Sequence, residues 1–354
     1  MRGRRSFLAG LLAAGLVPKP TWAEAGSPDF ISAGMTPDGA FVLCGLSAGG
    51  EIVFQLPLPA RGHAAAAHPA RPEAVAFARR PGTFALVIDC ITGRETARLL
   101  APEGRHFYGH GAFSADGDLL FTTENDYEAG LGRVGIWDVR RGYVRLGEFS
   151  SGGVGPHEIR LMPDGVTLAV ANGGIETHPE TGRIKLNIPT MRPNLSYLDF
   201  DGHTRGVAEL DTELRKNSIR HIAVAGDGSV AFGTQWQGDL TDRPPLLGLH
   251  NLAQGEPPRL VDAATSDPLQ GYVGSVAVDR GRVAITSPRG GRVQAFDARS
   301  LAMLTERAVE DVCGVATTAD GFIASSGAGL VMQAEDGAVL ARHPVRWDNH
   351  LVKV

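Results

Sequence analysis

The sequence is poor in cysteine, and its three cysteines lack any motif spacing. Cys44, Cys90 and Cys313 are far apart in 354 residues, and no CxxC, CxxCH or zinc-ligand spacing occurs. Covalent attachment of a c-type haem is therefore excluded. Each thiol stands among apolar or small residues in an expected strand, which predicts buried free cysteines, with one disulfide in an oxidising compartment as the alternative.

Long apolar runs, helical periodicity and concentrated positive charge are also missing. No apolar run reaches the ~18 residues of a membrane span, and no stretch of about ten residues after the N-terminal segment has strong helical periodicity. The formal net charge is −5, unlike that of nucleic-acid-binding proteins. GxSxG, HExxH and a helix-opening GxGxxG are absent too. We therefore expect no membrane span in the mature protein and no nucleic-acid partner.

Glycine and proline are abundant, with 46 and 22 residues. Short apolar strands end in tight turns of similar form at residues 37–39, 81–82, 116–117, 163–165, 227–228, 279–281 and 320–321. Glycine supplies the positive φ that such hairpins need. Successive turns are 35 to 63 residues apart, the spacing of propeller blades. The sequence thus predicts an all-β fold: one seven-bladed β-propeller domain over residues 26–354, closed by a C-terminal strand at 350–354.

The first 25 residues have the form of a twin-arginine signal peptide. Arg4-Arg5 is followed by Phe7-Leu8 and a short apolar core, and small residues at Ala23 or Ala25 offer cleavage sites. The apolar core is too short to span a membrane. Loss of residues 1–23 would leave 30 basic against 39 acidic residues. We therefore expect an acidic protein that is exported to the periplasm.

Polar residues occupy matching positions in three consecutive expected blades. His110, Glu158 and His221 each stand six residues before the aspartate of the following turn, while His157 and Arg220 stand seven before it. In a propeller, the start of the innermost strand and the end of the second strand lie on the same face. The ends of the second strands are polar as well, so one face of the disc is expected to bind a ligand.

The candidate ligand-binding residues on this face are His110, Glu124, His157, Glu158, Arg160, Asn172, His178, Arg220, His221, Gln235, Trp236, Asn349 and His350. His110, Glu158 and His221 form a candidate set of two histidines and one carboxylate for a transition metal. Arg160 and Arg220 favour instead a clamp on a carboxylate or phosphate, and Trp236 offers a stacking surface. In a third interpretation, these groups only satisfy one another along a wet channel.

The chain resembles a bacterial family of twin-arginine-exported seven-bladed propellers, catalogued as a domain of unknown function. The resemblance covers nearly the whole mature chain and rests on residues 109–114 (GHGAFS), 122–127 (TTENDY), 155–158 (GPHE), 171–179 (ANGGIETHP), 191–195 (MRPNL), 235–239 (QWQGD) and 347–350 (WDNH). More broadly, the fold is similar to YVTN-type and WD-type propellers. The resemblance implies a periplasmic propeller, often encoded near imelysin-like iron-uptake proteins and a haem-containing thiol-oxidoreductase-like protein. It assigns no catalytic residues.

Two functions are compatible with these features. The first is a non-enzymatic binding propeller that supports iron or other metal handling and holds a small molecule or a periplasmic protein partner over the polar face. The second is an enzyme, a lactonase-like hydrolase or a metal-dependent oxidoreductase, that uses the same face. A transition metal is the candidate cofactor, and the catalytic residues of the second function are not identified by any motif.

Overall fold

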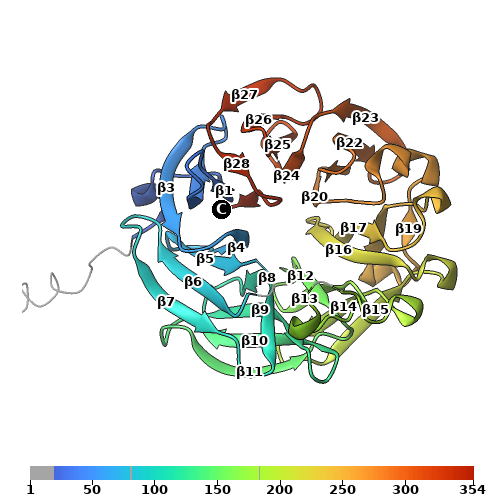
Figure 1. The fold of residues 1–354 in the computed structure, drawn as a ribbon, viewed down its shortest axis with the longest axis horizontal. Coiled ribbons are helices and arrows are strands. Elements are labelled where there is room, and N and C mark those ends of the chain that lie inside the picture. The colour runs from blue at the N-terminus through green and yellow to red at the C-terminus, as the bar shows by residue number, and fades with distance from the viewer. Residues whose placement is uncertain (1–19, 80–81, 183) are drawn as a thin grey trace, which may run out of the picture.

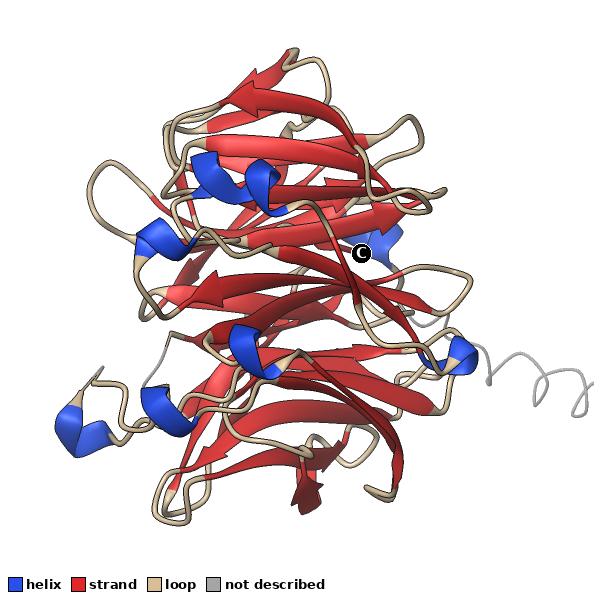
Figure 2. Cartoon of the chain, turned by 90° about the vertical axis from the view of Figure 1, so that its right-hand side faces the viewer, coloured by secondary structure: helices blue, strands red, loops and turns tan. Residues whose placement is uncertain are grey.

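Seven antiparallel sheets, six of four strands and one of five, surround a central axis in the computed structural model, which describes residues 20–79, 82–182 and 184–354 (Figure 1). This confirms the predicted seven-bladed β-propeller. Figure 2 shows the disc from its side, with the short helical turns lying in the loops between strands. In the described part of the chain, no helix is both long enough and apolar enough to cross a membrane. The predicted signal peptide falls mainly on residues 1–19, which lie outside the described residues.

Each of blades 2 to 7 uses four consecutive strands, ordered from the axis outward. Blades 2 to 4 contain β4 (Gly62–Ala67), β5 (Glu73–Ala78), β6 (Phe84–Asp89) and β7 (Glu95–Leu100); β8 (Arg105–Phe113), β9 (Leu119–Asp126), β10 (Leu131–Asp138) and β11 (Val144–Ser150); and β12 (Pro156–Leu161), β13 (Thr167–Asn172), β14 (Asn194–Asp199) and β15 (Thr204–Glu209).

The same order continues through the second half of the chain. Blades 5 to 7 contain β16 (Asn217–Val224), β17 (Ser229–Trp236), β18 (Leu247–Asn251) and β19 (Arg259–Leu260); β20 (Ser275–Asp279), β21 (Arg282–Ser287), β22 (Arg292–Asp297) and β23 (Met303–Ala308); and β24 (Val312–Thr317), β25 (Phe322–Ser326), β26 (Leu330–Gln333) and β27 (Val339–Arg342). The loops hold 3-10 turns η1 (Trp22–Ala25), η2 (Pro179–Thr181), η3 (Ile188–Thr190), η4 (Thr212–Leu214), η5 (Leu240–Asp242), η6 (Leu252–Gln254) and η7 (Ala263–Leu269).

Blade 1 joins the two ends of the chain. It contains β1 (Phe30–Met35), β2 (Phe41–Leu46) and β3 (Ile52–Leu58), and its innermost position is taken by β28 (Arg346–Trp347) and β29 (Val352–Lys353), which both pair with β1. The C-terminal segment therefore closes the ring, as predicted. The closing strand begins earlier than expected, at Arg346. It is interrupted between β28 and β29, where its register against β1 shifts by two residues.

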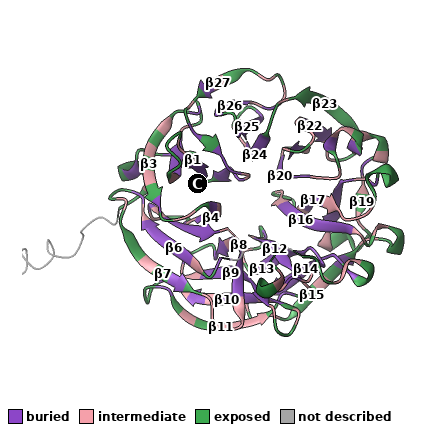
Figure 3. Cartoon of the chain, viewed as in Figure 1, coloured by how far each residue is buried: buried purple, intermediate pink, exposed green. Residues whose placement is uncertain are grey.

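The core consists of apolar contacts between neighbouring sheets. Phe77, Phe107 and Trp137, for example, pack together between blades 2 and 3. Figure 3 shows that the inner strands are buried, whereas outer strands such as β7 and β23 face solvent. The three cysteines are buried and free, which confirms that prediction.

Candidate metal centre

The innermost position of six of the seven blades contains an irregularity. The register against the second strand shifts within β4, β8, β12, β16 and β24, and again between β28 and β29. Such bulges turn side chains away from the regular alternation of a strand. Five of these six shifts fall beside or across a histidine: His63, His110, His157, His221 and His350.

These five residues form what we call the histidine cluster. The imidazole rings of neighbouring members have their centroids 4.6 to 5.1 Å apart. All but His63 are buried. Gly109 allows the close approach of two blades here: its φ is +103°, and a Cβ atom at this position would lie 2.4 Å from Cδ2 of His63. Five of the 11 histidines of the chain therefore converge on the axis.

The nitrogen atoms of the cluster are spaced for a metal ion. His63, His110 and His157 form one triplet and His110, His221 and His350 another, and within each triplet the candidate ligand atoms lie within 4.8 Å of one another. Nitrogen ligands at 2.0–2.1 Å from one ion would stand roughly 3 to 4 Å apart. Small side-chain rotations would thus bring either triplet into coordination, and His110 belongs to both.

Several ring nitrogens in the cluster have no hydrogen-bond partner in the described part of the protein. These atoms are Nδ1 of His63, Nε2 of His110, Nδ1 of His157 and Nε2 of His350. Buried polar atoms without a partner are uncommon, because each costs about 1–3 kcal/mol. Four such nitrogens in one cluster are explained if they are ligands of an ion.

Glu158 holds one member of the cluster in place. Its Oε2 lies 3.2 Å from Nδ1 of His221 and accepts a hydrogen bond from the backbone N–H of Ile222. Its Oε1 is 2.6 Å from a guanidinium nitrogen of Arg160. With Nδ1–H of His221 donated to the carboxylate, Nε2 keeps its lone pair for an ion. Glu158 therefore acts here as the partner of a candidate ligand, and it is in neither triplet.

The electrostatics of the site favour uncharged imidazoles at His63, His110, His157 and His350. Burial lowers the pKa of His63 to about 3. Burial, together with the neighbouring histidines, also holds the pKa of His110, His157 and His350 well below the usual value. Burial alone would raise the pKa of Glu158, but Arg160 and the hydrogen bond from His221 outweigh it and lower this pKa to about 2. Neutral histidines are the form that binds metals.

A pH-dependent stability of the metal-free protein follows from these shifts. In the unfolded chain the four histidines titrate near pH 6.5, whereas in the folded protein their pKa values are lower. Below pH 6.5 the unfolded state therefore binds more protons, and the free energy of unfolding should fall as the pH drops from about 7.5 to about 5. Urea unfolding at both pH values measures this. A double variant, His110→Gln with His350→Gln, should depend less on pH; an equal dependence in both proteins contradicts the prediction.

A polar cavity of about 300 Å³ opens onto the cluster from the face where the innermost strands begin. His63, His157 and His221 line its inner end. A larger groove, of about 610 Å³, lies between the turns of blades 5 and 6 on the opposite face. We place the functional site at the smaller cavity, because no histidine of the cluster lines the groove.

The predicted binding residues separate into those at the centre and those elsewhere. His110, His157, His221 and His350 belong to the cluster, with Glu158 and Arg160 beside it. Arg220, Gln235, Trp236 and Asn349 line the cavity with the cluster. Asn172 is fully buried away from the cavity, where it bonds Ser151 and Asn194.

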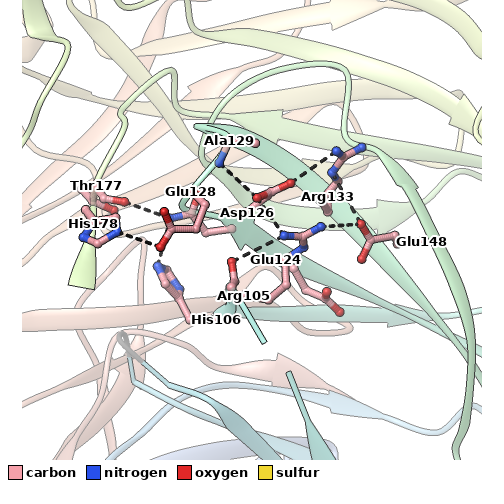
Figure 4. A network of polar contacts seen from close by, with 12 residues as sticks. Arg105, His106, Glu124, Asp126, Glu128, Ala129, Arg133, Glu148, Thr177 and His178 are labelled. Carbon is pink, nitrogen blue, oxygen red and sulfur yellow. Dashed lines mark hydrogen bonds and ion pairs between the residues drawn. The ribbon is translucent and has the colours of Figure 1, made fainter. Parts of the chain in front are cut away.

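Glu124 and His178 belong to a separate polar network on blade 3 and its neighbouring loop (Figure 4). Glu124 is fully buried and receives two hydrogen bonds from Arg145, at 2.7 and 2.9 Å. Arg105 joins Asp126 and Glu148 in the same network. His178 lies 3.4 Å from Glu128. Neither Glu124 nor His178 lines the cavity, so the structure does not bring them to the candidate centre.

His63 is the member of the cluster that sequence reasoning missed. The turn expected for blade 2, at 81–82, falls in the segment between β5 and β6, in which residues 80–81 lie outside the described residues. The turn at 37–39 joins the second strand of blade 1 to the third. The turn that follows β4 contains no glycine and runs from His68 to Glu73. The backbone carbonyl of Glu73 accepts a hydrogen bond from the N–H of His68. Counted back from the start of that turn, His63 occupies the same strand position as His157 in blade 4 and Arg220 in blade 5. The proline-rich segment His68-Pro69-Ala70-Arg71-Pro72 was the sequence signal that could have located this turn.

The chain is thus a seven-bladed β-propeller with a histidine cluster on its axis and a cavity above it. It belongs to the family described as "Protein of unknown function (DUF1513)", whose model matches residues 56–354. No curated protein matches the chain. Among solved structures it is similar to Kuenenia stuttgartiensis hydrazine synthase, with 14% sequence identity and a TM-score of 0.60 over 88% of this chain and 95% of that one. At this identity the similarity shows the fold alone.

Proposed function

We propose that this protein is a periplasmic propeller that binds one transition-metal ion in the histidine cluster. The observation that carries the proposal is the convergence of five mostly buried imidazoles, with four partnerless ring nitrogens among them. Imidazole ligands suit Cu(II), Zn(II), Ni(II) and Fe(II), and the affinity of a given site usually peaks at Cu(II). Handling of ferrous iron is one form of this proposal.

The basic experiment is equilibrium dialysis of the metal-free protein against each of these ions, followed by elemental analysis. The proposal expects about one ion per chain, with copper retained most strongly. Retention of less than about a tenth of an ion per chain for all four would overturn it.

The Glu158 carboxylate should tune the affinity of this site. In Glu158→Gln the carboxylate charge next to His221 is lost, while the size of the side chain is kept. We expect metal affinity to fall about 10–100-fold, as for other partners of metal-ligating histidines. Competition with a chromogenic chelator measures the change. Glu180→Gln, an exposed carboxylate outside the cluster, is the control, and equal affinities in the two variants would contradict the role of Glu158.

Export is the part of the proposal that rests on the sequence of the N-terminal segment. Replacing Arg4 and Arg5 by lysine should leave the precursor in the cytoplasm, because the twin-arginine pathway reads that pair. Fractionation of cells that express the natural and the double-lysine forms checks this. An unchanged periplasmic yield of the variant would mean that the chain uses another route.

A further inference from the structure

The five members of the histidine cluster lie at two depths below the cavity. His63 and His157 line the cavity and are the most exposed members: His63 is only partly buried, and 9% of His157 is exposed. The exposed fractions of His110, His221 and His350 are 4%, 2% and 6%. His221 lines the cavity as well, yet it is the most enclosed of the five. One side of the cluster therefore faces solvent through the cavity, and the other side is enclosed by protein.

The two candidate triplets divide along this difference in depth. The triplet of His63, His110 and His157 contains both of the more exposed histidines, and we call it the outer triplet. The triplet of His110, His221 and His350 is wholly buried, and we call it the inner triplet. His110 belongs to both. An ion can therefore exchange its other two ligands while His110 remains a ligand.

The inner triplet has the stronger set of donors. Nδ1 of His221 lies 3.2 Å from a carboxylate oxygen of Glu158. A carboxylate on the second nitrogen of an imidazole orients the ring and makes the first nitrogen a better ligand. Among the described residues, Nδ1 of His63 and Nδ1 of His157 have no hydrogen-bond partner. The inner triplet is therefore expected to hold an ion more tightly, and the outer triplet to be reached first from solvent.

We propose that a transition-metal ion enters through the cavity onto the outer triplet and then moves to the inner triplet, where it is retained. The inference rests on the proposed metal site. His63 and His157 act as entry ligands. His221 and His350 hold the ion, and His110 serves at both positions. Only metal–nitrogen bonds change in the transfer: two imidazoles leave the ion, two others replace them, and the charge of the ion stays the same.

The test follows copper uptake by the metal-free mature protein in a stopped-flow fluorimeter. Bound Cu(II) quenches tryptophan fluorescence, and Trp236 lines the cavity. The outer variant is His63→Gln, with His157→Gln as a second outer variant, and the inner variant is His350→Gln. His178→Gln, in the loop after β13 and in neither triplet, is the matched control. Competition with a chromogenic chelator gives the dissociation constants, elemental analysis gives the number of ions retained, and circular dichroism checks that each variant is folded.

The natural protein and His178→Gln should take up copper in two phases. The rate of the first phase should rise with copper concentration, as for capture by the outer triplet, and the rate of the second should not, as for a transfer within the protein. His63→Gln should slow the first phase at least about 10-fold but change the dissociation constant less than about threefold, because entry and exit cross the same barrier. His350→Gln should keep the first phase, lose the second, and bind copper at least about 10-fold more weakly.

The two-position inference and the metal site fail on different results. If the natural protein retains copper but takes it up in a single phase, the two-position inference is wrong and the metal site stands. The same holds if the outer and inner variants change the uptake rate and the dissociation constant alike, or if His63→Gln weakens binding more than His350→Gln does. If the natural protein retains no copper, the metal site itself fails.

Discussion

Replacing His110 by alanine should remove most of the metal affinity while leaving the fold intact. His110 belongs to both triplets of the histidine cluster, so neither triplet survives its loss. We expect the affinity for copper to fall by at least about 100-fold, more than for the loss of a partner outside the ligand set. Its Nε2 has no hydrogen-bond partner among the described residues, so removing it leaves none of them unsatisfied. The melting temperature of the metal-free variant should stay within a few degrees of that of the natural protein.

The matched control for this variant is His203→Ala. His203 forms an exposed group with Asp199 and Asp201 that could also collect metal ions. This change should leave the tight copper site untouched. Metal should also raise the free energy of unfolding of the natural protein, by about 2.7 kcal/mol at 100 times the dissociation constant. The melting temperature of the natural protein should therefore rise with metal concentration, and that of His110→Ala should not. Unchanged copper affinity in His110→Ala would show that the cluster is not the metal site.

Removal of residues 346–354 should have the largest effect on stability. The deletion takes away β28 and β29, which occupy the innermost position of blade 1. It exposes the edge of β1 and removes the buried side chains of Trp347, Leu351 and Val352. Loss of one large core side chain alone costs about 3–5 kcal/mol. We therefore expect the melting temperature to fall by more than about 10 °C, or the protein to aggregate.

A point variant separates closure of the ring from metal binding. Trp347→Ala should lower stability by about 3–5 kcal/mol, yet it keeps His350 and should still bind copper at pH 7.5 and low temperature. Trp347→Phe should lose less stability than Trp347→Ala. Circular dichroism melting and dialysis measure the two properties in the same samples. A truncated protein that melts at the natural temperature would contradict the account of closure.

The sequence was sufficient to predict the fold because each blade repeats the same local signals. Glycine turns and short apolar strands recur along the chain, and the closing segment could be recognised from the need to pair an open sheet edge. The turn at 81–82 misled the count in blade 2, since it joins β5 to β6 and not β4 to β5. Counting back from turns therefore works only where the first two strands of a blade are joined by the glycine turn.

The candidate site could be predicted only in part. His110 and His221 share one register position and His157 a neighbouring one, so their common face followed from the sequence. His63 precedes a turn without glycine, and His350 reaches the axis through the two-residue shift between β28 and β29. Glu124 and Asn172 also lie near the ends of second strands, but their side chains meet Arg145 and Asn194 inside the blades. Such pairing depends on neighbouring strands and is not visible in one strand's sequence.

The most direct test of the metal site is anomalous diffraction from crystals of the copper-loaded protein, recorded at the copper edge. The account predicts one strong peak inside the histidine cluster, about 2.0–2.1 Å from a ring nitrogen of His110 and of at least two other members. Absence of a peak in the cluster, or a peak only at the exposed group around Asp199 and His203, would contradict it.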